Sequence, residues 1–324
     1  MTDATQKTFT LTNDQNGDSV KLPVLDGNDG PSVIDVRKLY AQTGHFTYDP
    51  GFRATGSCDS ALTYIDGEQG ILLHRGYAIE DLAAKSDYME VCYLLLHGEL
   101  PSSDQKTLFE STITHHTMVH EQIRTFFNGF RRDAHPMAIM CGVVGALSAF
   151  YHDSMDINNP RHREIFAHRI IAKLPTISAA AYKRSIGQPF IYPRNDLDYC
   201  SNLLHMFYAV PCEPYHIDPL AAQALDLLLI LHADHGLNAS TFAGRVTIAT
   251  LSDMYSAMTT AVGTLKGPLH GGANEEVMIM LDEIGSMDNV EPFIKGKLER
   301  KELIMGFGHR VYKAYDPRAT YLKT

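Results

Sequence analysis

The segment GPLHGGAN, residues 267–274, places a histidine just before the expected start of a helix. Pro268 stops any preceding helix because proline lacks an N–H and clashes with the turn before it. The apolar residues that follow recur at helical spacing, which predicts an amphipathic helix over residues 273–284. Gly271 and Gly272 allow a backbone to approach a ligand closely. The segment therefore predicts a ligand site at a helix N-terminus.

His270 is the candidate catalytic residue of this segment. A helix N-terminus carries unpaired N–H groups and about half a positive charge, which disfavours a protonated imidazole. A neutral imidazole at that place can donate a hydrogen bond to a carbonyl oxygen that is becoming an enolate. We therefore expect catalysis at this position.

A second segment, HADHGLNAST at residues 232–241, follows a long apolar stretch and carries two histidines three residues apart. On a continuing helix, His232 and His235 would lie on one face. Such a pair could form an anion or carbonyl site at the helix end, or bind a metal ion. It could equally do no more than satisfy the last carbonyls of the helix. The spacing leaves these interpretations open.

A third segment, GFGHRVYKAYDPRA at residues 306–319, places His309 and Arg318 in glycine-flanked surroundings. Gly306 and Gly308 free the backbone to contact a flat or phosphorylated ligand, and arginine forks grip carboxylates bidentately. A solvated basic turn is the alternative interpretation. Hydrogen-bond donors on three glycine-bearing segments suit enolate chemistry on a keto acid; the four candidates are His235, His270, His309 and Arg318.

Composition is that of an ordinary globular protein, with 44% hydrophobic and 20% charged residues in a chain of 324. The net charge of −10 argues against non-specific nucleic-acid binding, which needs clustered Lys and Arg. Five scattered cysteines without CxxC spacing favour a reducing compartment. The N-terminus has no apolar signal region, and we expect a cytoplasmic protein.

The sequence predicts a mainly α-helical chain with a short β-rich N-terminal segment. Alternating apolar residues predict strands within residues 7–36, and a hairpin joins residues 62–65 to 71–74. Helical periodicity dominates from residue 75, and a helix stops at Gly98. Further helices are expected at about 104–115, 117–128, 136–152, 160–173, 176–186, 196–209, 218–234, 251–265, 273–284 and 290–300.

Asp316 and Pro317 form a good helix start, but only seven residues follow them. A helix so short is unstable unless it is packed. We therefore expect that the chain is cut inside a domain that normally continues.

The three segments, in this order, resemble the citrate synthase family, and the likeness extends over nearly the whole chain. GPLHGGAN and GFGHRVYK…DPRA are highly specific for that family. The stretches at 65–83, 151–164 and 185–197 resemble its bacterial branch with an N-terminal β-segment, whereas HADHGLNASTFAGR is more similar to other bacterial branches. The resemblance implies a mainly α fold with three parts: a β-rich segment over 1–45, a large helical domain over 46–281, and the incomplete start of a small, CoA-side domain over 282–324.

The family condenses acetyl-CoA with oxaloacetate and water to citrate and CoA, so the resemblance implies acetyl-CoA as co-substrate and no permanently bound cofactor or metal. By position, His270 would stabilise the acetyl-CoA enolate and His309 would polarise the oxaloacetate carbonyl. The remaining implied roles are oxaloacetate binding by His235, Arg318 and Asn238, and contact with CoA by Gly306, Phe307 and Gly308.

The family's catalytic base, an aspartate, has no counterpart in these 324 residues, so we expect the polypeptide itself to be inactive or nearly so. Three alternatives stay open. A 2-methylcitrate synthase would use propionyl-CoA, and one methylene shifts selectivity by only about 1–3 kcal/mol. A metal hydrolase could use His232, His235 and another histidine. A non-catalytic fragment could serve oligomerisation or regulation.

The resemblance also implies a homo-dimer or a hexamer, and in the bacterial branch inhibition by NADH. Four residues stand in stretches where that branch has its regulatory site: Tyr151, Arg169, Lys173 and Cys212. An arginine usual in that site is replaced here by His115. NADH regulation is therefore an expectation to be tested by titration.

Overall fold

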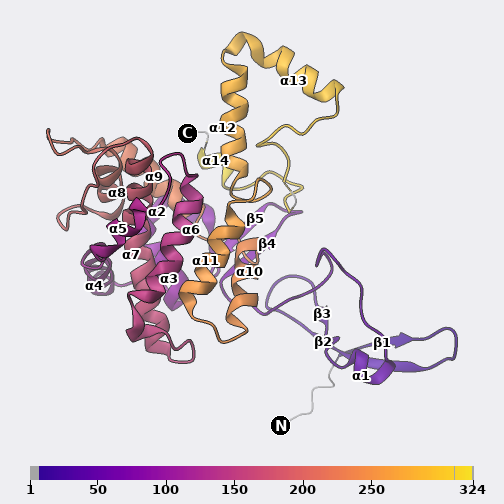
Figure 1. Cartoon of the computed structure of the whole chain (residues 1–324). Helices are drawn as coiled ribbons and strands as arrows, with labels where there is room; N and C mark the ends of the chain where they lie inside the picture. Colours follow the sequence, from indigo (N-terminus) through magenta and orange to yellow (C-terminus); the bar gives the residue numbers. More distant parts are fainter. Residues whose placement is uncertain (1–6, 310, 323–324) are drawn as a thin grey trace.

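The computed structural model describes residues 7–309 and 311–322 of the chain. These residues form fourteen α-helices and two three-stranded antiparallel sheets (Figure 1). All the named strands lie between residues 8 and 78, and helices follow them. The expectation of a mainly α-helical chain with a β-rich N-terminal segment is confirmed.

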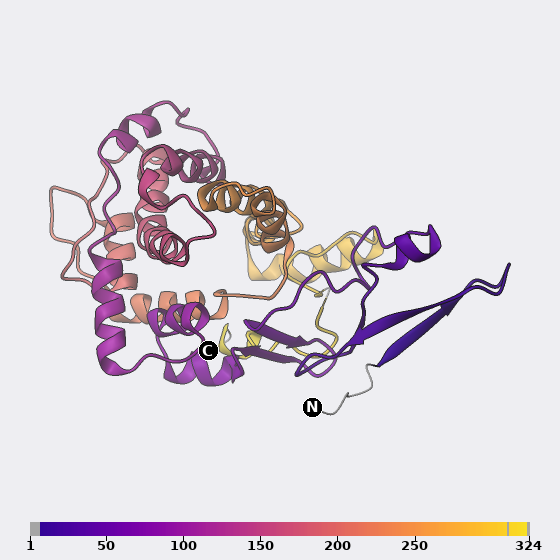
Figure 2. The ribbon, with the colours of Figure 1, turned by 90° about the horizontal axis from the view of Figure 1, so that it is seen from below.

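The first sheet forms an arm that extends away from the helical body (Figures 1 and 2). Phe9 and Leu11 keep 51% and 46% of their surface exposed, so this sheet buries little apolar area. The alternation of apolar and polar residues thus predicts the strands correctly, although no core lies beneath them. The elements of the arm are β1 (Thr8–Thr12), β2 (Ser19–Leu25), β3 (Val33–Ile34) and the short helix α1 (Leu39–Thr43).

The second sheet is the predicted hairpin, with β4 (Thr63–Asp66) paired to β5 (Ile71–His74) and a short β6 (Tyr77–Ala78) beside β5. Its turn is closed by the Gly70 N–H, which donates to the Asp66 carbonyl at 2.8 Å. The chain then enters α2 (Ile79–Lys85) and α3 (Tyr88–His97).

Helices α2 and α3 bury apolar side chains against the hairpin and against the later helix α9 (Pro219–Leu231). Asp87 starts α3 through a capping box with Glu90, and Gly98 ends it in the left-handed conformation at φ 94°. The predicted stop at Gly98 is therefore confirmed.

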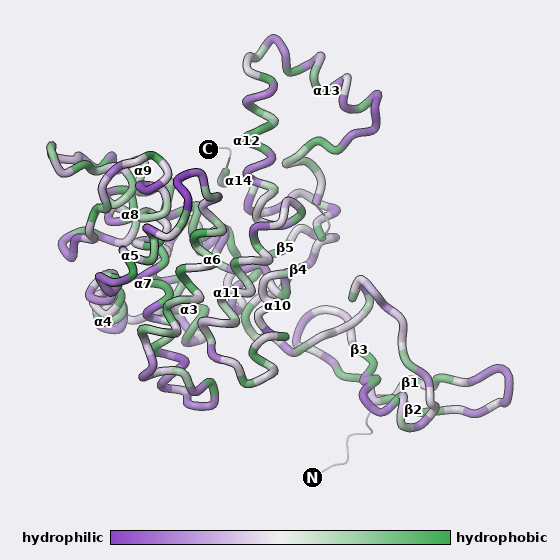
Figure 3. The backbone as a smooth tube through the Cα atoms, viewed as in Figure 1, coloured by the Kyte–Doolittle hydropathy of each residue, from purple (hydrophilic) through white to green (hydrophobic). Residues whose placement is uncertain are grey.

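The helical body packs around a core between α6 and α7, in which Val143, Phe166 and Ile177 are buried. The hydropathy of the backbone trace alternates along these helices, as their one-sided burial requires (Figure 3). The helices of the body are α4 (Ser103–Thr114), α5 (Gln122–Asn128), α6 (Pro136–Ala146), α7 (Pro160–Ser185), α8 (Tyr199–Tyr208), α9 (Pro219–Leu231), α10 (Ala239–Ile248) and α11 (Met254–Leu265).

The sequence predicts a break near Pro175, but α7 runs through it. A proline inside a helix leaves the carbonyl four residues earlier without its usual donor. Here that carbonyl belongs to Ile171, and the Tyr199 hydroxyl donates to it at 2.9 Å. A tertiary contact therefore replaces the missing helical bond.

The expected start of a helix at residue 117 is also wrong, because α5 begins at Gln122. Polar side chains of α7 take the carbonyls of the preceding segment: the Thr176 hydroxyl donates to Thr117 at 2.8 Å, and Lys173 donates to Met118 at 2.5 Å. Because side chains of α7 already satisfy these carbonyls, the segment needs no helical hydrogen bonds there.

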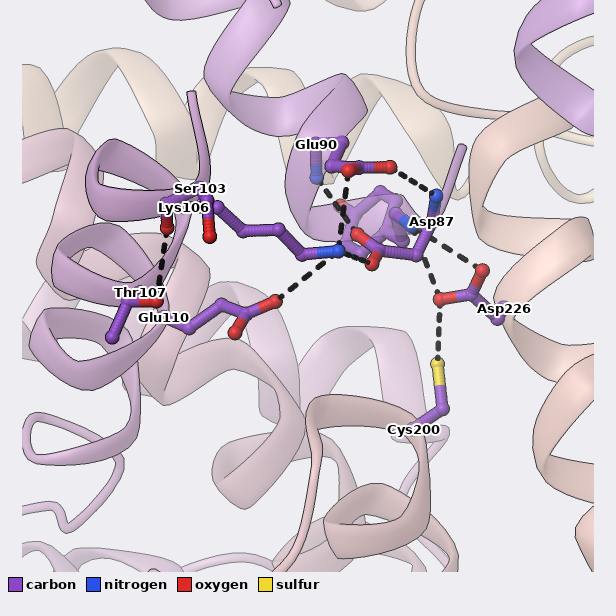
Figure 4. Close-up of polar contacts among 9 residues, drawn as sticks. Asp87, Glu90, Ser103, Lys106, Thr107, Glu110, Cys200 and Asp226 are labelled. Carbon is purple, nitrogen blue, oxygen red and sulfur yellow. Dashed lines mark hydrogen bonds and ion pairs between the residues drawn. The ribbon is translucent and has the colours of Figure 1, made fainter. Parts of the chain in front are cut away.

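A polar cluster joins α3, α4, α8 and α9 (Figure 4). The Lys106 ammonium contacts Asp87 and lies 3.2 Å from Glu90. Asp226 accepts the Tyr88 backbone N–H at 3.1 Å and faces the Cys200 thiol at 3.5 Å. Through these contacts the carboxylates cap α3 and connect it to α4, α8 and α9.

Helices α12 (Ala273–Ile284) and α13 (Val290–Glu299) project from the body (Figure 1). The domain boundary expected at residue 281 falls inside α12, and it stays a prediction. After α13 the chain returns to the β4–β5 hairpin, where the Lys313 N–H donates to the Gly67 carbonyl at 2.8 Å, and ends in α14 (Ala319–Leu322). Among the described helices, none is long and apolar enough to cross a bilayer.

Candidate active site

The three predicted segments meet at one cavity of about 1180 Å³. Residues of α10, α11 and the start of α12 line it. Six of the candidate residues line it, together with a serine that no sequence motif marks: His232, His235, Asn238, His270, His309, Arg318 and Ser240. The structure therefore brings the predicted donors to a single place.

Backbone N–H groups that follow His309 in the chain fix which of its ring nitrogens carries the proton. Its Nδ1 accepts the N–H of Val311 at 3.0 Å and that of Tyr312 at 3.1 Å. An imidazole nitrogen that accepts carries no proton, so the proton of the neutral ring lies on Nε2. Burial lowers the pKa of His309, which favours this neutral form. His309 can therefore donate one hydrogen bond from Nε2 to a ligand oxygen.

His235 and His309 lie with their ring centres 5.6 Å apart, and Tyr312 contacts both. The Tyr312 hydroxyl is 3.2 Å from Nε2 of His235. Burial lowers the pKa of His235 to about 4, and the charge of Arg318 acts in the same direction. The two imidazoles are thus uncharged near neutral pH, and an anionic ligand here must be held by hydrogen bonds and by Arg318.

Arg318 is paired within its own segment. Its Nε and Nη2 donate to the Asp316 carboxylate at 3.1 and 2.8 Å. This fork holds one edge of the guanidinium at the cavity wall, and the other edge stays available to a carboxylate. Asp316 therefore orients Arg318 and offsets part of its charge.

His270 lies three residues before α12, half-buried at the cavity wall. Its Nε2 is 2.8 Å from the Ser240 hydroxyl, which is also 3.0 Å from the Ala261 carbonyl. The hydroxyl can donate its one proton to the Ala261 carbonyl, in which case its oxygen accepts from Nε2–H of His270, or it can donate to Nε2 itself. If the proton goes to Nε2 of His270, the ring carries its own proton on Nδ1 and can donate it to a ligand. Ser240 therefore controls which face of His270 is a donor.

Other predicted residues have different places. Asn238 caps α10, with its side chain accepting the Thr241 N–H at 3.0 Å, and it also lines the cavity. Gly306 and Gly308 have φ of 83° and 81°, which only glycine adopts easily. With Phe307, 71% exposed, they form a loop outside the cavity lining.

His232 caps α9 at its C-terminal end, where its Nδ1 is 2.7 Å from the Leu228 carbonyl. The helix ends at Leu231 rather than at the expected residue 234, so His232 and His235 do not share a helix face. Within residues 7–309 and 311–322, no three or more His, Cys, Asp and Glu side chains are grouped as metal ligands.

Three of the four predicted NADH-site residues lie together. The Arg169 guanidinium is 4.7 Å and the Lys173 ammonium 5.2 Å from the ring centre of Tyr151. Burial, helped by Arg169, lowers the pKa of Lys173 to about 8. Cys212 is exposed in the turn after α8.

Serine and tyrosine contacts in the site were not found from the sequence. Ser240 stands two residues after the helix-capping Asn238, where a serine is common without any catalytic role. Tyr312 stands between Val311 and Lys313 in the sequence, and only the folded chain shows that its side chain is buried. Neither residue carries a sequence signal that separates it from its neighbours.

Comparison with known proteins gives consistent results. Residues 51–324 match the family model of the citrate synthase C-terminal domain. The citrate synthase of Thermotoga maritima MSB8 is 36% identical, with a TM-score of 0.73, over 86% of this chain and 72% of that one. The Pyrobaculum aerophilum citrate synthase is 35% identical, with a TM-score of 0.73, over 93% and 71%.

A third structure is that of the citrate synthase from Thermoplasma acidophilum in a ternary complex with carboxymethyl coenzyme A and oxaloacetate. It is 32% identical to this chain, with a TM-score of 0.79, over 84% of this chain and 70% of that one. That protein binds both ligands in one complex.

Proposed function

This chain belongs to the citrate synthase family, and on that premise we propose that its cavity binds oxaloacetate and the acyl end of acetyl-CoA for condensation to citrate. The main support for this proposal is the hydrogen-bonding state of His309. His309, whose Nδ1 accepts two backbone N–H groups, presents Nε2–H as a donor in the same cavity as His235, His270 and Arg318.

In the proposed reaction Arg318 holds a carboxylate of oxaloacetate, and His235 contacts the same ligand. His309 donates from Nε2 to the ketone oxygen and makes its carbon more electrophilic. His270 donates from Nδ1 to the thioester oxygen as the acetyl methyl group loses a proton and becomes an enolate.

The enolate carbon then forms the new C–C bond with the ketone carbon. Nε2–H of His309 stabilises the resulting alkoxide, which is neutralised through solvent by the proton that the base removed from the methyl group. Water cleaves the thioester of citryl-CoA, which releases citrate and CoA. We assign the CoA contact to the backbone of Gly306, Phe307 and Gly308, and homo-oligomerisation and NADH inhibition remain proposals of the same kind.

The base that removes the methyl proton is not assigned to a described carboxylate. Glu275 is 2.9 Å from the ring of His135, and Asp234 accepts the Gly236 N–H at 2.8 Å. Asp316 is paired with Arg318. Each of these groups is already held by a protein donor, so none of them stands ready for a methyl proton.

Isothermal calorimetry with oxaloacetate tests the binding half of the proposal. Arg318→Gln should weaken binding by about ten- to a hundredfold, since hydrogen bonds to charged groups are worth about 1.5–3 kcal/mol. Arg194→Gln is the matched control, because Arg194 pairs with Asp196 as Arg318 pairs with Asp316 but lies on the surface. No binding to the unmodified chain, or equal binding by Arg318→Gln, would overturn the assignment.

A further inference from the structure

The β4–β5 hairpin contacts both of the segments that carry His235 and His309. On one side, the Thr63 hydroxyl lies 2.5 Å from the Asp234 carboxylate, next to His235 in the chain. On the other side, the Gly67 carbonyl in the turn accepts two backbone N–H groups from residues 313–314, at 2.8 and 3.2 Å. The hairpin therefore lies between two parts of the site that are far apart in the sequence.

The contact at the turn is unusually close. A Cβ on Gly67 would lie 2.0 Å from the Val311 carbonyl oxygen, and a Cβ on Gly70 would lie 2.7 Å from the Tyr315 carbonyl oxygen. Both glycines therefore allow backbone-to-backbone packing against the segment that begins at His309. An ion pair between Lys313 and Glu68 adds a side-chain contact to the same surface.

Thr63 on β4 is paired with His74 on β5, and the His74 side chain is fully buried. The Thr63 hydroxyl has one proton, and the Asp234 carboxylate can only accept it. The Thr63 oxygen must then accept from Nδ1 of His74, 3.2 Å away. Burial lowers the pKa of His74, so the ring is neutral, with its proton on Nδ1.

The hydrogen bonds from His74 through Thr63 continue to the turn that carries His235. Asp234 accepts the Gly236 N–H at 2.8 Å as well as the Thr63 hydroxyl. Gly236 has φ of 64°, and the Ile65 side chain packs against it. The turn that carries His235 is thus held at its carboxylate and at its glycine by residues of β4.

We propose that Thr63 and His74 are positioning residues for oxaloacetate binding, because they hold the turn of His235 in register with the His309 segment that the same hairpin binds through Gly67. The inference rests on the proposed function for its ligand. It concerns a contact between elements, and neither residue is placed in the cavity lining.

The test compares Thr63→Val, which keeps the shape and loses the hydroxyl, with Thr63→Ser, which keeps the hydroxyl. Thr12→Val is the matched control, because Thr12 also bonds across a hairpin, to Ser19 at 2.9 Å, but in the N-terminal arm. We expect Thr63→Val to weaken oxaloacetate binding about tenfold by calorimetry, the usual effect of one lost hydrogen bond to a charged group. Thr63→Ser should bind within about twofold of the unmodified chain, and Thr12→Val should bind equally.

A second readout needs no ligand. In ¹⁵N-histidine-labelled protein, His74 should show its proton on Nδ1, and Thr63→Val should shift the ring resonances of His235 while leaving those of His216 in place. Unchanged His235 resonances in Thr63→Val, or His74 protonated on Nε2, would overturn the proposal. If the unmodified chain binds no oxaloacetate but the His235 shift occurs, the positioning contact stands and the proposed function fails.

Discussion

The Ser240 hydroxyl lies 2.8 Å from Nε2 of His270 and 3.0 Å from the Ala261 carbonyl, so its one proton can go either to the ring or to the carbonyl. The proposed donor role of His270 requires that the proton point at the ring, because only then does Nδ1 carry the imidazole proton. A helix-end serine thus decides the chemistry of a neighbouring imidazole.

Ser240→Ala removes the hydroxyl that bonds to Nε2 of His270, so nothing at that nitrogen favours one tautomer of the ring. We expect His270 to lose its preference for the Nδ1–H form, seen as an averaged pair of ring ¹⁵N shifts in place of two distinct ones. Ser148→Ala is a suitable control, since Ser148 also donates to a helix carbonyl, that of Gly145 at 2.8 Å, without touching an imidazole. A His270 spectrum that Ser240→Ala leaves unaltered contradicts the role assigned to the serine.

Stability should fall between neutral pH and about pH 4 because of His235. Its pKa is about 4 in the folded chain and 6.5 in its unperturbed state, so the unfolded chain binds more protons in this window. The free energy of unfolding then decreases as the pH falls through it, by up to about 3 kcal/mol for a shift of this size and less after solvent screening.

His235→Gln should flatten that pH dependence, as urea unfolding at pH 5 and pH 7 would measure. His216→Gln, which alters an exposed histidine, should leave it as it is. Burial lowers the pKa of His74 and His309 as well, so part of the slope remains in the variant. A slope equal to that of the unmodified chain would show that His235 titrates normally when folded.

The sequence predicted most elements from periodicity and capping, but several expected ends were wrong, such as residue 152 for α6, which ends at Ala146, and residue 234 for α9, which ends at Leu231. The helix over residues 273–284 agrees with α12, and the hairpin of β4 and β5 is found within a residue. Helix α10 was missed, although Asn238 caps its start, because its sequence ASTFAGRVTI combines a glycine with several β-branched residues of low helix propensity. Local propensity fails where tertiary contacts stabilise an element that its own residues do not favour.

The site shows the same division. His235, His270 and His309 were predicted as site residues because they stand in glycine-bearing segments, where the backbone can approach a ligand or another segment closely. Thr63 was not found, because its partner Asp234 is 171 positions away and no local pattern encodes that pairing. Contacts between distant segments require the fold.

Tyr199→Phe should destabilise the chain by about 1–2 kcal/mol, because it leaves the Ile171 carbonyl without a donor next to Pro175. In a Pro175→Ala background the alanine N–H can take that carbonyl, so the same substitution should cost clearly less. A double-mutant cycle from urea unfolding measures the difference. Equal costs in the two backgrounds would mean that Tyr199 does not replace the missing bond.

Gly67→Ala should destabilise the chain by about 1–3 kcal/mol, as overpacking usually does, since its Cβ would meet the Val311 carbonyl oxygen at 2.0 Å. Gly263→Ala, in α11, is the control, because its Cβ would make an ordinary 3.7 Å contact with the Cys141 sulfur of α6. Thermal unfolding compares the two variants. Were Gly67→Ala as stable as the control, the hairpin and residues 311–315 would not pack as closely as described.

The polypeptide of residues 1–324 should bind oxaloacetate and yet turn over acetyl-CoA very slowly. The carboxylates around its cavity are held, Glu275 near His135, Asp234 by the Gly236 N–H and Asp316 by Arg318, so none is free to take a methyl proton. A thiol-release assay with acetyl-CoA and oxaloacetate, run beside calorimetry on the same sample, separates the two properties. A repeat with propionyl-CoA covers the 2-methylcitrate alternative. Ordinary turnover with either thioester would mean that one of these three held carboxylates, or a group outside the cavity lining, serves as the base, and single substitutions of the three would then identify it.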